Sequence, residues 1–166
     1  GNKVAVLSGQ AGLAMTACDV CEEKGLVLAV FSEETQRTIQ RALPPMAIRT
    51  NPVDMGPAWY DPGAIREVVS SVLGDENVDA VVLCIAYASA NSAAVESLAD
   101  LLKSWGRQKP IVCCLSSPRA IWDQEIRSLK EEGVPNYPTP ERAARALASL
   151  WRYQELATTS LHHECH

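Results

Sequence analysis

A small corner near the start of the chain carries the residues best suited to chemistry. The stretch VAVLSGQAGLAM, residues 4–15, passes from an apolar strand pattern through Gly9 and Gly12 into an alanine-rich apolar helix. Glycines can adopt backbone angles closed to other residues and let an anion approach the amides. A helix starting near Leu13 would direct partial positive charge at that anion. The corner therefore predicts anion binding, with a tight turn whose glycines serve only packing as the equal alternative.

The corner does not match the known nucleotide-binding motifs. Its G-x-x-G lacks the third glycine of a dinucleotide fingerprint, and Phe31 and Ser32 stand where that fingerprint needs an acidic residue. A P-loop is excluded because no G-K-[ST] follows. The groups that remain available at this corner to bind an anion are backbone N–H groups.

The side chains offer little catalytic chemistry of their own. Histidine occurs only in the final HHECH, and the chain has no serine–histidine arrangement and no acid pair with general acid–base spacing. We expect no catalytic residue in this chain and an inactive isolated domain. HHECH contains metal-ligating residue types, His162, His163, Cys165 and His166, but a solvated terminus is favoured because nothing around it could support the ligands. We expect no metal site.

The cysteines are expected to pack in the core. Cys84, Cys113 and Cys114 lie in apolar strand-like runs, where cysteine behaves as a small hydrophobe. Cys18 and Cys21 form a C-x-x-C inside a helix rather than at its N-terminus, where a redox motif would stand.

Length and charge narrow the class of protein. The 166 residues suit one domain, and the net charge of −5 gives no footprint for nucleic acid or an anionic membrane. The longest apolar run, Ala80–Ala88, is half of the ~20 residues that a membrane crossing needs. No leader pattern precedes it, so a cytoplasmic location is expected. Because the first residue is Gly1 rather than Met, we expect a piece of a longer protein or a processed chain.

Strand and helix patterns alternate along the chain. Apolar runs predict five strands, and 3.6-residue periodicity with capping residues predicts six helices. The segment 46–63, rich in proline, is expected to be irregular. The expected strands are 3–7, 26–31, 78–86, 110–115 and 134–137, and the expected helices are 13–24, 33–43, 62–73, 92–105, 118–132 and 140–153.

This order predicts an α/β fold. Short strands separated by helices form a parallel sheet covered on both faces, because right-handed crossovers exclude most alternatives. We expect a flavodoxin-like (Rossmann-type) three-layer αβα domain over residues 1–153, with a five-stranded parallel sheet in the order 2-1-3-4-5. Residues 154–166 are expected to form a disordered tail or linker. Ligands bind such sheets beyond the carboxyl ends of the strands, beside strand 1.

Three stretches give a family resemblance. GNKVAVLSGQAGLAMTACDVCEEKGLVLAVFSEETQRTIQRALPP, NPVDM and GVPNYPTPERAARALASLWRY resemble the ligase-CoA domain of NDP-forming acyl-CoA synthetases. That superfamily includes the ADP-forming acetyl-CoA synthetases and succinyl-CoA synthetase, and AGLAM is similar to the matching loop of the latter's β subunit. The resemblance runs from Gly1 to about Tyr153.

The resemblance implies a role within a larger enzyme. Acid, CoA and ATP interconvert with acyl-CoA, ADP and phosphate through a phosphohistidine, which belongs to a neighbouring domain. The nucleotide belongs to an ATP-grasp domain and CoA to a CoA-binding domain. The resemblance thus implies ATP or ADP, Mg and CoA in the full-length enzyme, with none bound by this domain alone.

The resemblance also implies the site. The first helix would point its N-terminus at the phosphohistidine, with Asn51 and Asp54 shaping the adjacent wall. For those two residues we favour turn architecture over chemistry, because Asn-Pro and Asp also make turns. The implied phosphate- or phosphohistidine-binding residues are Ser8, Gly9, Gln10, Ala11, Gly12 and Leu13.

Departures from the family pattern leave alternatives open. Members commonly carry a Gly-Gly-Pro-Gly corner preceded by Asn, whereas Gly9, Ala11, Leu13 and Ala14 stand at the corresponding positions here. The chain could instead be a ligand-sensing regulatory domain of a protein-lysine acetyltransferase, or a divergent inactive paralogue.

A structural role is the third alternative. Trp59, Tyr60, Trp151 and Tyr153 are expected to be exposed and would suit the interface of a homo-oligomer.

Overall fold

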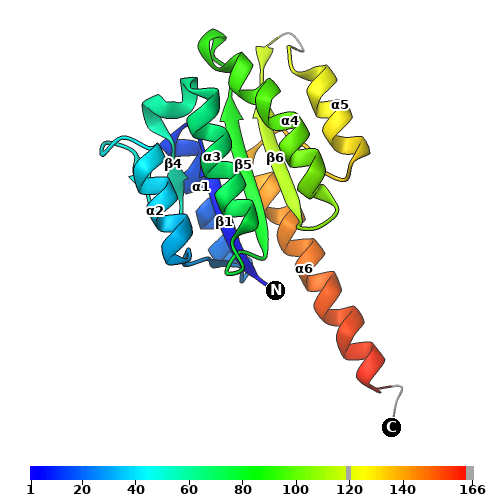
Figure 1. Cartoon of the computed structure of the whole chain (residues 1–166). Coiled ribbons are helices and arrows are strands. Elements are labelled where there is room, and N and C mark those ends of the chain that lie inside the picture. Colours follow the sequence, from blue (N-terminus) through cyan, green and yellow to red (C-terminus); the bar gives the residue numbers. More distant parts are fainter. Residues whose placement is uncertain (119–120, 164–166) are drawn as a thin grey trace.

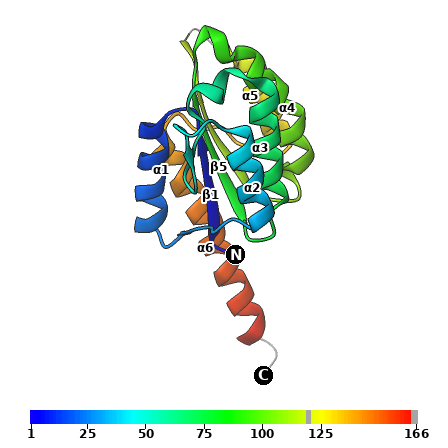
Figure 2. The same ribbon diagram turned by 60° about the vertical axis from the view of Figure 1, so that its left-hand side comes forward.

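A central sheet carries helices on both of its faces (Figures 1 and 2). The computed structural model describes residues 1–118 and 121–163, with side chains described through residue 158. Helices α1 and α6 cover one face, and α2, α3, α4 and α5 cover the other. The expected three-layer α/β fold is confirmed.

The elements are as follows. The strands are β1 (Lys3–Ser8), β2 (Val27–Leu28), β3 (Ile48–Arg49), β4 (Val53–Asp54), β5 (Ala80–Ala86) and β6 (Ile111–Ser116). The α-helices are α1 (Ala11–Glu23), α2 (Glu33–Ala42), α3 (Pro62–Gly74), α4 (Ser92–Gly106), α5 (Asp123–Glu131) and α6 (Pro140–His163). Two 3₁₀ helices, η1 (Gly56–Tyr60) and η2 (Ser89–Asn91), precede α3 and α4.

The sheet runs in the order β3-β4-β1-β5-β6, and β2 also pairs with β1. Strands β1, β5 and β6 are parallel neighbours and correspond to the expected strands 1, 3 and 4. The expected fifth strand, 134–137, is reduced to one parallel bridge between Cys113 and Asn136. The order 2-1-3-4-5 therefore holds for the centre of the sheet and differs at its edges.

The second strand position is filled by two segments rather than one. Strand β2 pairs with β1 only at Lys3 and Val4, and β4 takes the same edge of β1 at Leu7 and Ser8. The expected strand 26–31 was therefore too long. The segment 46–63 was expected to be irregular but contains β3, β4 and η1. Because β2 ends early, the backbone groups at the carboxyl end of β1 need another pairing partner, and β4 provides it.

A single side chain closes the gap between β2 and β4. The Asn51 Oδ1 accepts the Val6 N–H at 2.9 Å, and its Nδ2 donates to the carbonyls of Val4 at 2.8 Å and Ala29 at 3.0 Å. Backbone groups that would otherwise lie unpaired at the edge of β1 are satisfied in this way. The Asn51 carboxamide thus takes the place of a strand residue.

Side chains of the central strands alternate between two apolar layers. Leu7, Leu83 and Leu115 face α2 to α5, whereas Val6, Val82 and Cys114 face α1 and α6. A strand that is apolar on both faces is typical of a buried parallel sheet. The core packing expected for the cysteines is confirmed for Cys18, Cys21, Cys84, Cys113 and Cys114, which are buried and free.

Capping residues set most helix boundaries as expected. Ser32 and Asp61 accept backbone N–H groups at the starts of α2 and α3. Gly25 and Gly133 each have φ of 84° after α1 and α5, the left-handed conformation that ends helices. Helix α5 begins later than the expected 118; residues 119–120 lie outside the described part of the chain.

Helix α6 continues past the expected end near Tyr153 to His163 and extends away from the body (Figure 1). The expectation of a tail without regular structure from residue 154 was wrong up to that point. The reason is local, because residues 154–163 contain no glycine or proline and include strong helix formers. Residues 164–166, and the side chains of His162 and His163, lie outside what the structure describes. Within the described chain, no helix is long and apolar enough to span a membrane.

The Asn51 carboxamide yields a stability prediction. Replacing Asn51 with alanine leaves the buried Val6 N–H without its acceptor, so the free energy of unfolding should fall by about 1–3 kcal/mol. Urea denaturation followed by circular dichroism measures this. Asn77→Ala, at an exposed asparagine, is the control and should change stability by less than about 0.5 kcal/mol. Equal stability of the two variants would contradict the strand-filling role.

Candidate functional site

The corner between β1 and α1 is held by backbone and hydroxyl contacts. The Ser8 hydroxyl accepts the Gln10 N–H at 3.0 Å and lies within donating distance of the Gln10 and Cys84 carbonyls, at 2.8 and 3.0 Å. The Gly9 N–H donates to the Cys84 carbonyl at 3.3 Å. Two of the amides expected to meet an anion, those of Gly9 and Gln10, are therefore already bonded within the protein.

The helix begins two residues before the expected Leu13. Gln10 is its N-cap, and the Gln10 carbonyl accepts the Ala14 N–H at 3.3 Å. The turn closed by Ser8 brings the chain into helical geometry as early as Ala11. The start near Leu13 was wrong because this hydroxyl turn is not visible in the hydrophobic periodicity.

Three amides at the start of α1 remain open. The first N–H groups of a helix have no acceptor within it, and the Gln10 side chain does not cap α1. Among the described residues no acceptor pairs with the N–H groups of Ala11, Gly12 and Leu13. Ala11 and Gly12 are exposed and Leu13 is half-buried. The chain thus presents three N–H donors and the positive end of a 13-residue helix dipole at one place.

The two glycines of the corner have different structural roles. Neither Gly9 nor Gly12 adopts the left-handed backbone region, so the expectation of special backbone angles was wrong. A Cβ on Gly9 would lie 2.7 Å from Cδ2 of Trp59, whose buried indole covers this glycine. A Cβ on Gly12 would meet nothing within 4 Å. Packing explains Gly9, whereas Gly12 leaves the amides of the first turn uncovered.

Asn51 and Asp54 do not form one wall together. The Asn51 carboxamide is used along β1, as described above. Asp54 stands opposite Ser8 in the sheet, and its Oδ1 accepts the Gly56 N–H at 3.1 Å. Asp54 therefore borders the corner, whereas Asn51 lies further towards the amino end of β1, beside Val4 and Val6. Both side chains are engaged in local architecture, which favours that interpretation over direct chemistry.

Sequence reasoning missed two residues that shape the carboxyl end of the sheet, near the corner. Trp59, expected to be exposed, is only 1% exposed and packs on Gly9. Asn91 is fully buried, and its carboxamide accepts the Ala88 N–H and donates to the Ala86 carbonyl, each at 3.0 Å. The one available signal was an amide residue in YASANS, directly after an apolar strand.

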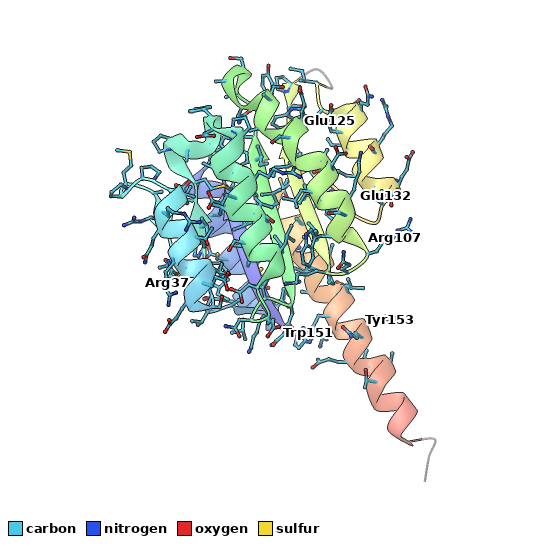
Figure 3. All side chains as sticks on the ribbon, in the orientation of Figure 1. Arg37, Arg107, Glu125, Glu132, Trp151 and Tyr153 are labelled. Atoms are coloured by element: carbon cyan, nitrogen blue, oxygen red, sulfur yellow. The ribbon has the colours of Figure 1, made fainter. Side chains whose placement is uncertain are left out.

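The other aromatic residues of the structural alternative differ in exposure. Tyr60 is 54% and Tyr153 71% exposed, and Tyr153 points away from the body of the protein on α6 (Figure 3). Trp151 is half-buried and packs against the apolar layer beneath α1 and α6.

A second polar region lies at the opposite end of the sheet. A cavity of about 450 Å³ between the start of α2 and the end of α3 is lined in part by Ser32, Thr35 and Asp75. Burial alone would raise the pKa of Asp75, but N–H donors from Asn77 and Ser32 outweigh it and hold that pKa below its usual value. Both carboxylate oxygens are occupied by these backbone groups, so Asp75 is a structural residue. Nowhere in the described chain do three or more His, Cys, Asp or Glu side chains gather in a way that could hold a metal ion.

The whole-chain comparison agrees with this architecture. Residues 4–160 match the Ligase-CoA domain family, and the chain belongs to that family. Among curated proteins it is 31% identical over 155 residues to "Acetate--CoA ligase [ADP-forming] I" of Archaeoglobus fulgidus, covering 93% of this chain and 21% of that protein. It is 29% identical over 158 residues to "Acetate--CoA ligase [ADP-forming] I subunit alpha" of Pyrococcus furiosus, covering 93% of this chain and 33% of the subunit.

Solved structures share the fold. The dinucleotide-forming acetyl-coenzyme A synthetase 1 of Ca. Korarchaeum cryptofilum, in complex with phosphate and ADP, matches with a TM-score of 0.79 and 22% identity. The match covers 93% of this chain and 33% of that one. The chain thus spans about a fifth to a third of the relatives that it matches.

The contrast between the two glycines can be tested by substitution. Gly9→Ala should lower the free energy of unfolding by about 1–3 kcal/mol, because the added methyl group overlaps the Trp59 indole. Gly12→Ala should leave it unchanged or raise it by up to about 1 kcal/mol, since the methyl group meets open space and alanine favours a helix. Urea denaturation followed by tryptophan fluorescence measures both. A stable Gly9→Ala variant would show that Trp59 moves freely.

The thiols of α1 give a second prediction. Burial raises the pKa of Cys18 to about 11 and that of Cys21 to about 12, so both stay protonated at pH 8. Because the thiolate is the reactive form, Ellman's reagent at pH 8 should modify neither residue in the folded protein and both after unfolding in guanidinium. Cys165, which lies outside the described residues, is replaced in Cys165→Ser, and peptide mapping assigns any modified thiol to its residue. Rapid modification of Cys21 in the folded protein would contradict a purely structural C-x-x-C.

Proposed function

We propose that this chain is the domain of an NDP-forming acyl-CoA synthetase that stabilises a phosphoryl group at the N-terminus of α1. The group would be a phosphohistidine presented by a neighbouring domain. One observation carries the proposal: the open N–H groups of Ala11, Gly12 and Leu13 at the carboxyl end of β1. Sheets of this kind bind their ligands at that edge.

Backbone donors are sufficient for this role. Hydrogen bonds to a charged acceptor contribute about 1.5–3 kcal/mol each, and the helix dipole adds roughly 0.3–1 kcal/mol, or about 2 in a partly buried setting. The donors stand at fixed positions on a helix packed against the sheet, so little reorganisation is needed when the phosphoryl group arrives. The corner sequence, residues 8–13, holds no ionisable side chain, so the positive potential comes from the main chain.

In the proposed reaction, acid, CoA and ATP yield acyl-CoA, ADP and phosphate. This chain contributes no nucleophile, and its part is to hold the phosphoryl group while other domains exchange its partners. ATP or ADP, Mg and CoA would be bound by the CoA-binding and ATP-grasp parts of the enzyme. Two findings support this division: the relatives are named as ADP-forming acetate–CoA ligases, and they are three to five times longer than this chain.

A phosphate titration tests the proposal. In ¹⁵N-resolved NMR spectra at pH 7.5, inorganic phosphate should shift the amide signals of Ala11, Gly12 and Leu13 more than those of Gly9 and Gln10, whose N–H groups are already bonded. Chloride at equal ionic strength is the control for screening. Amide signals that stay in place up to high phosphate concentration would count against phosphate binding at the first turn of α1.

A matched pair of valine variants separates binding from folding. Gly12→Val places a branched side chain over the open amides and should weaken phosphate binding by about tenfold or more, equivalent to about 1.4 kcal/mol. Gly74→Val, at the end of α3, is the control, since a Cβ there also meets nothing within 4 Å. Equal phosphate affinity in the two variants would show that the corner is only architecture.

A further inference from the structure

Two carboxamide side chains, at the starts of α1 and α4, form hydrogen bonds with the same residue of β5. The Gln10 Oε1 accepts the Ala86 N–H at 3.1 Å, and its Nε2 donates to the Ala86 carbonyl at 3.3 Å. The Asn91 Nδ2 donates to the same carbonyl at 3.0 Å. Gln10 and Asn91 are the N-caps of their helices, yet neither side chain caps its own helix.

The Gln10 contact continues the ladder between β1 and β5 by one pair. That ladder ends at Ser8 and Cys84, after which the Gly9 N–H still reaches the Cys84 carbonyl. In a strand, alternate residues direct their N–H and C=O to the same side, so Ala86 also faces the place that β1 has left. The planar carboxamide donates one of its N–H groups to the Ala86 carbonyl, accepts the Ala86 N–H, and so fills the place of the missing peptide group.

We propose that Gln10 is a positioning residue that fixes the direction of the first turn of α1. The inference rests on the proposed function and deepens it. Because the Gln10 side chain is tied to β5, the residue directly before Ala11 is held on two sides, by Ser8 through its backbone N–H and by Ala86 through its side chain. The open amides of Ala11, Gly12 and Leu13 then keep a common direction.

The arrangement has an energetic consequence for anion binding. The ends of helices fray, and a turn that samples several directions binds an anion only in the fraction of time when its amides converge. Holding the turn in advance removes that loss of affinity. The Gln10 carboxamide therefore acts through the amides and does not itself contact the anion.

The decisive variant is Gln10→Met, which keeps the length of the side chain and removes both hydrogen bonds to Ala86. Gln10→Asn keeps the carboxamide but shortens its reach by one methylene group and should behave alike. Gln40→Ala, at an exposed glutamine of α2, is the control. The thermal unfolding midpoint of each variant is measured first. Because Gln10 is only half-buried, we expect each variant to fold.

Two measurements on the full 166-residue chain are made with each variant. The ¹⁵N order parameters of the Ala11, Gly12 and Leu13 amides should fall in Gln10→Met from about 0.85 towards the flexible range below about 0.6. The dissociation constant for inorganic phosphate should rise by about threefold or more. The control should match the wild-type protein in both.

The outcomes separate this inference from the proposed function. If wild-type protein binds no phosphate, the proposed function fails, and the order parameters alone decide whether Gln10 holds the turn. If the wild-type protein binds phosphate and Gln10→Met binds it equally well, the positioning role is overturned while the proposed function stands. Order parameters unchanged in both Gln10 variants overturn the inference in every case.

Discussion

The structure depends on giving a hydrogen-bonding partner to every backbone group of a buried sheet, including the groups beyond the ends of neighbouring strands. Carboxamide side chains meet this need at several places where strands stop. Asn51 pairs with the outer edge of β1, Gln10 with the end of β5, and Asn136 with Leu115 on β6, accepting its N–H at 2.6 Å and donating to its carbonyl at 3.3 Å. Each of these side chains bonds to backbone groups of a strand that has no neighbouring strand at that point.

This constraint also explains why the candidate site stays open. Ser8 and Gln10 direct their polar groups into the sheet, towards Cys84 and Ala86, rather than onto the first turn of α1. The Trp59 indole fills the space against Gly9 on the side of the core. The side chains of Ser8 and Gln10, which could have capped the helix, are thus engaged elsewhere, and within the described chain the first amides of α1 have no side-chain cap.

The central architecture was predictable from the sequence because its signals are local. Apolar runs such as 80–86 mark buried parallel strands, and Ser32, Asp61 and Gly25 mark helix ends through their own side chains or backbone angles. The edges were not predictable in this way. The pairing of Val53 with Leu7 joins residues far apart in the chain, and the hydrophobic pattern of residues 46–63 does not predict it.

For the corner between β1 and α1, the sequence predicted the position of the turn but not its contacts. The glycines and the change of periodicity located the corner, whereas the start of α1 and the reason for Gly9 depended on contacts with Ser8 and Trp59. In the sequence, Gln10 was expected to belong to the phosphate-binding corner and Asn51 to a turn. Their function as substitutes for strand residues follows from distant backbone groups, which a single sequence does not reveal.

The divided strand position has a consequence for how this domain can change in evolution. The chain leaves the edge of β1 after Leu28, beside Val4, and returns at Val53, beside Leu7, three residues further along, or about 10 Å. The intervening segment contains α2 and the edge strand β3, and it leaves and rejoins β1 on the same edge. Exposed loop tips are preferred sites of tolerated insertion, so the exposed turn at Pro45 and Met46 is where we expect this segment to gain residues without altering the register of β4 on β1.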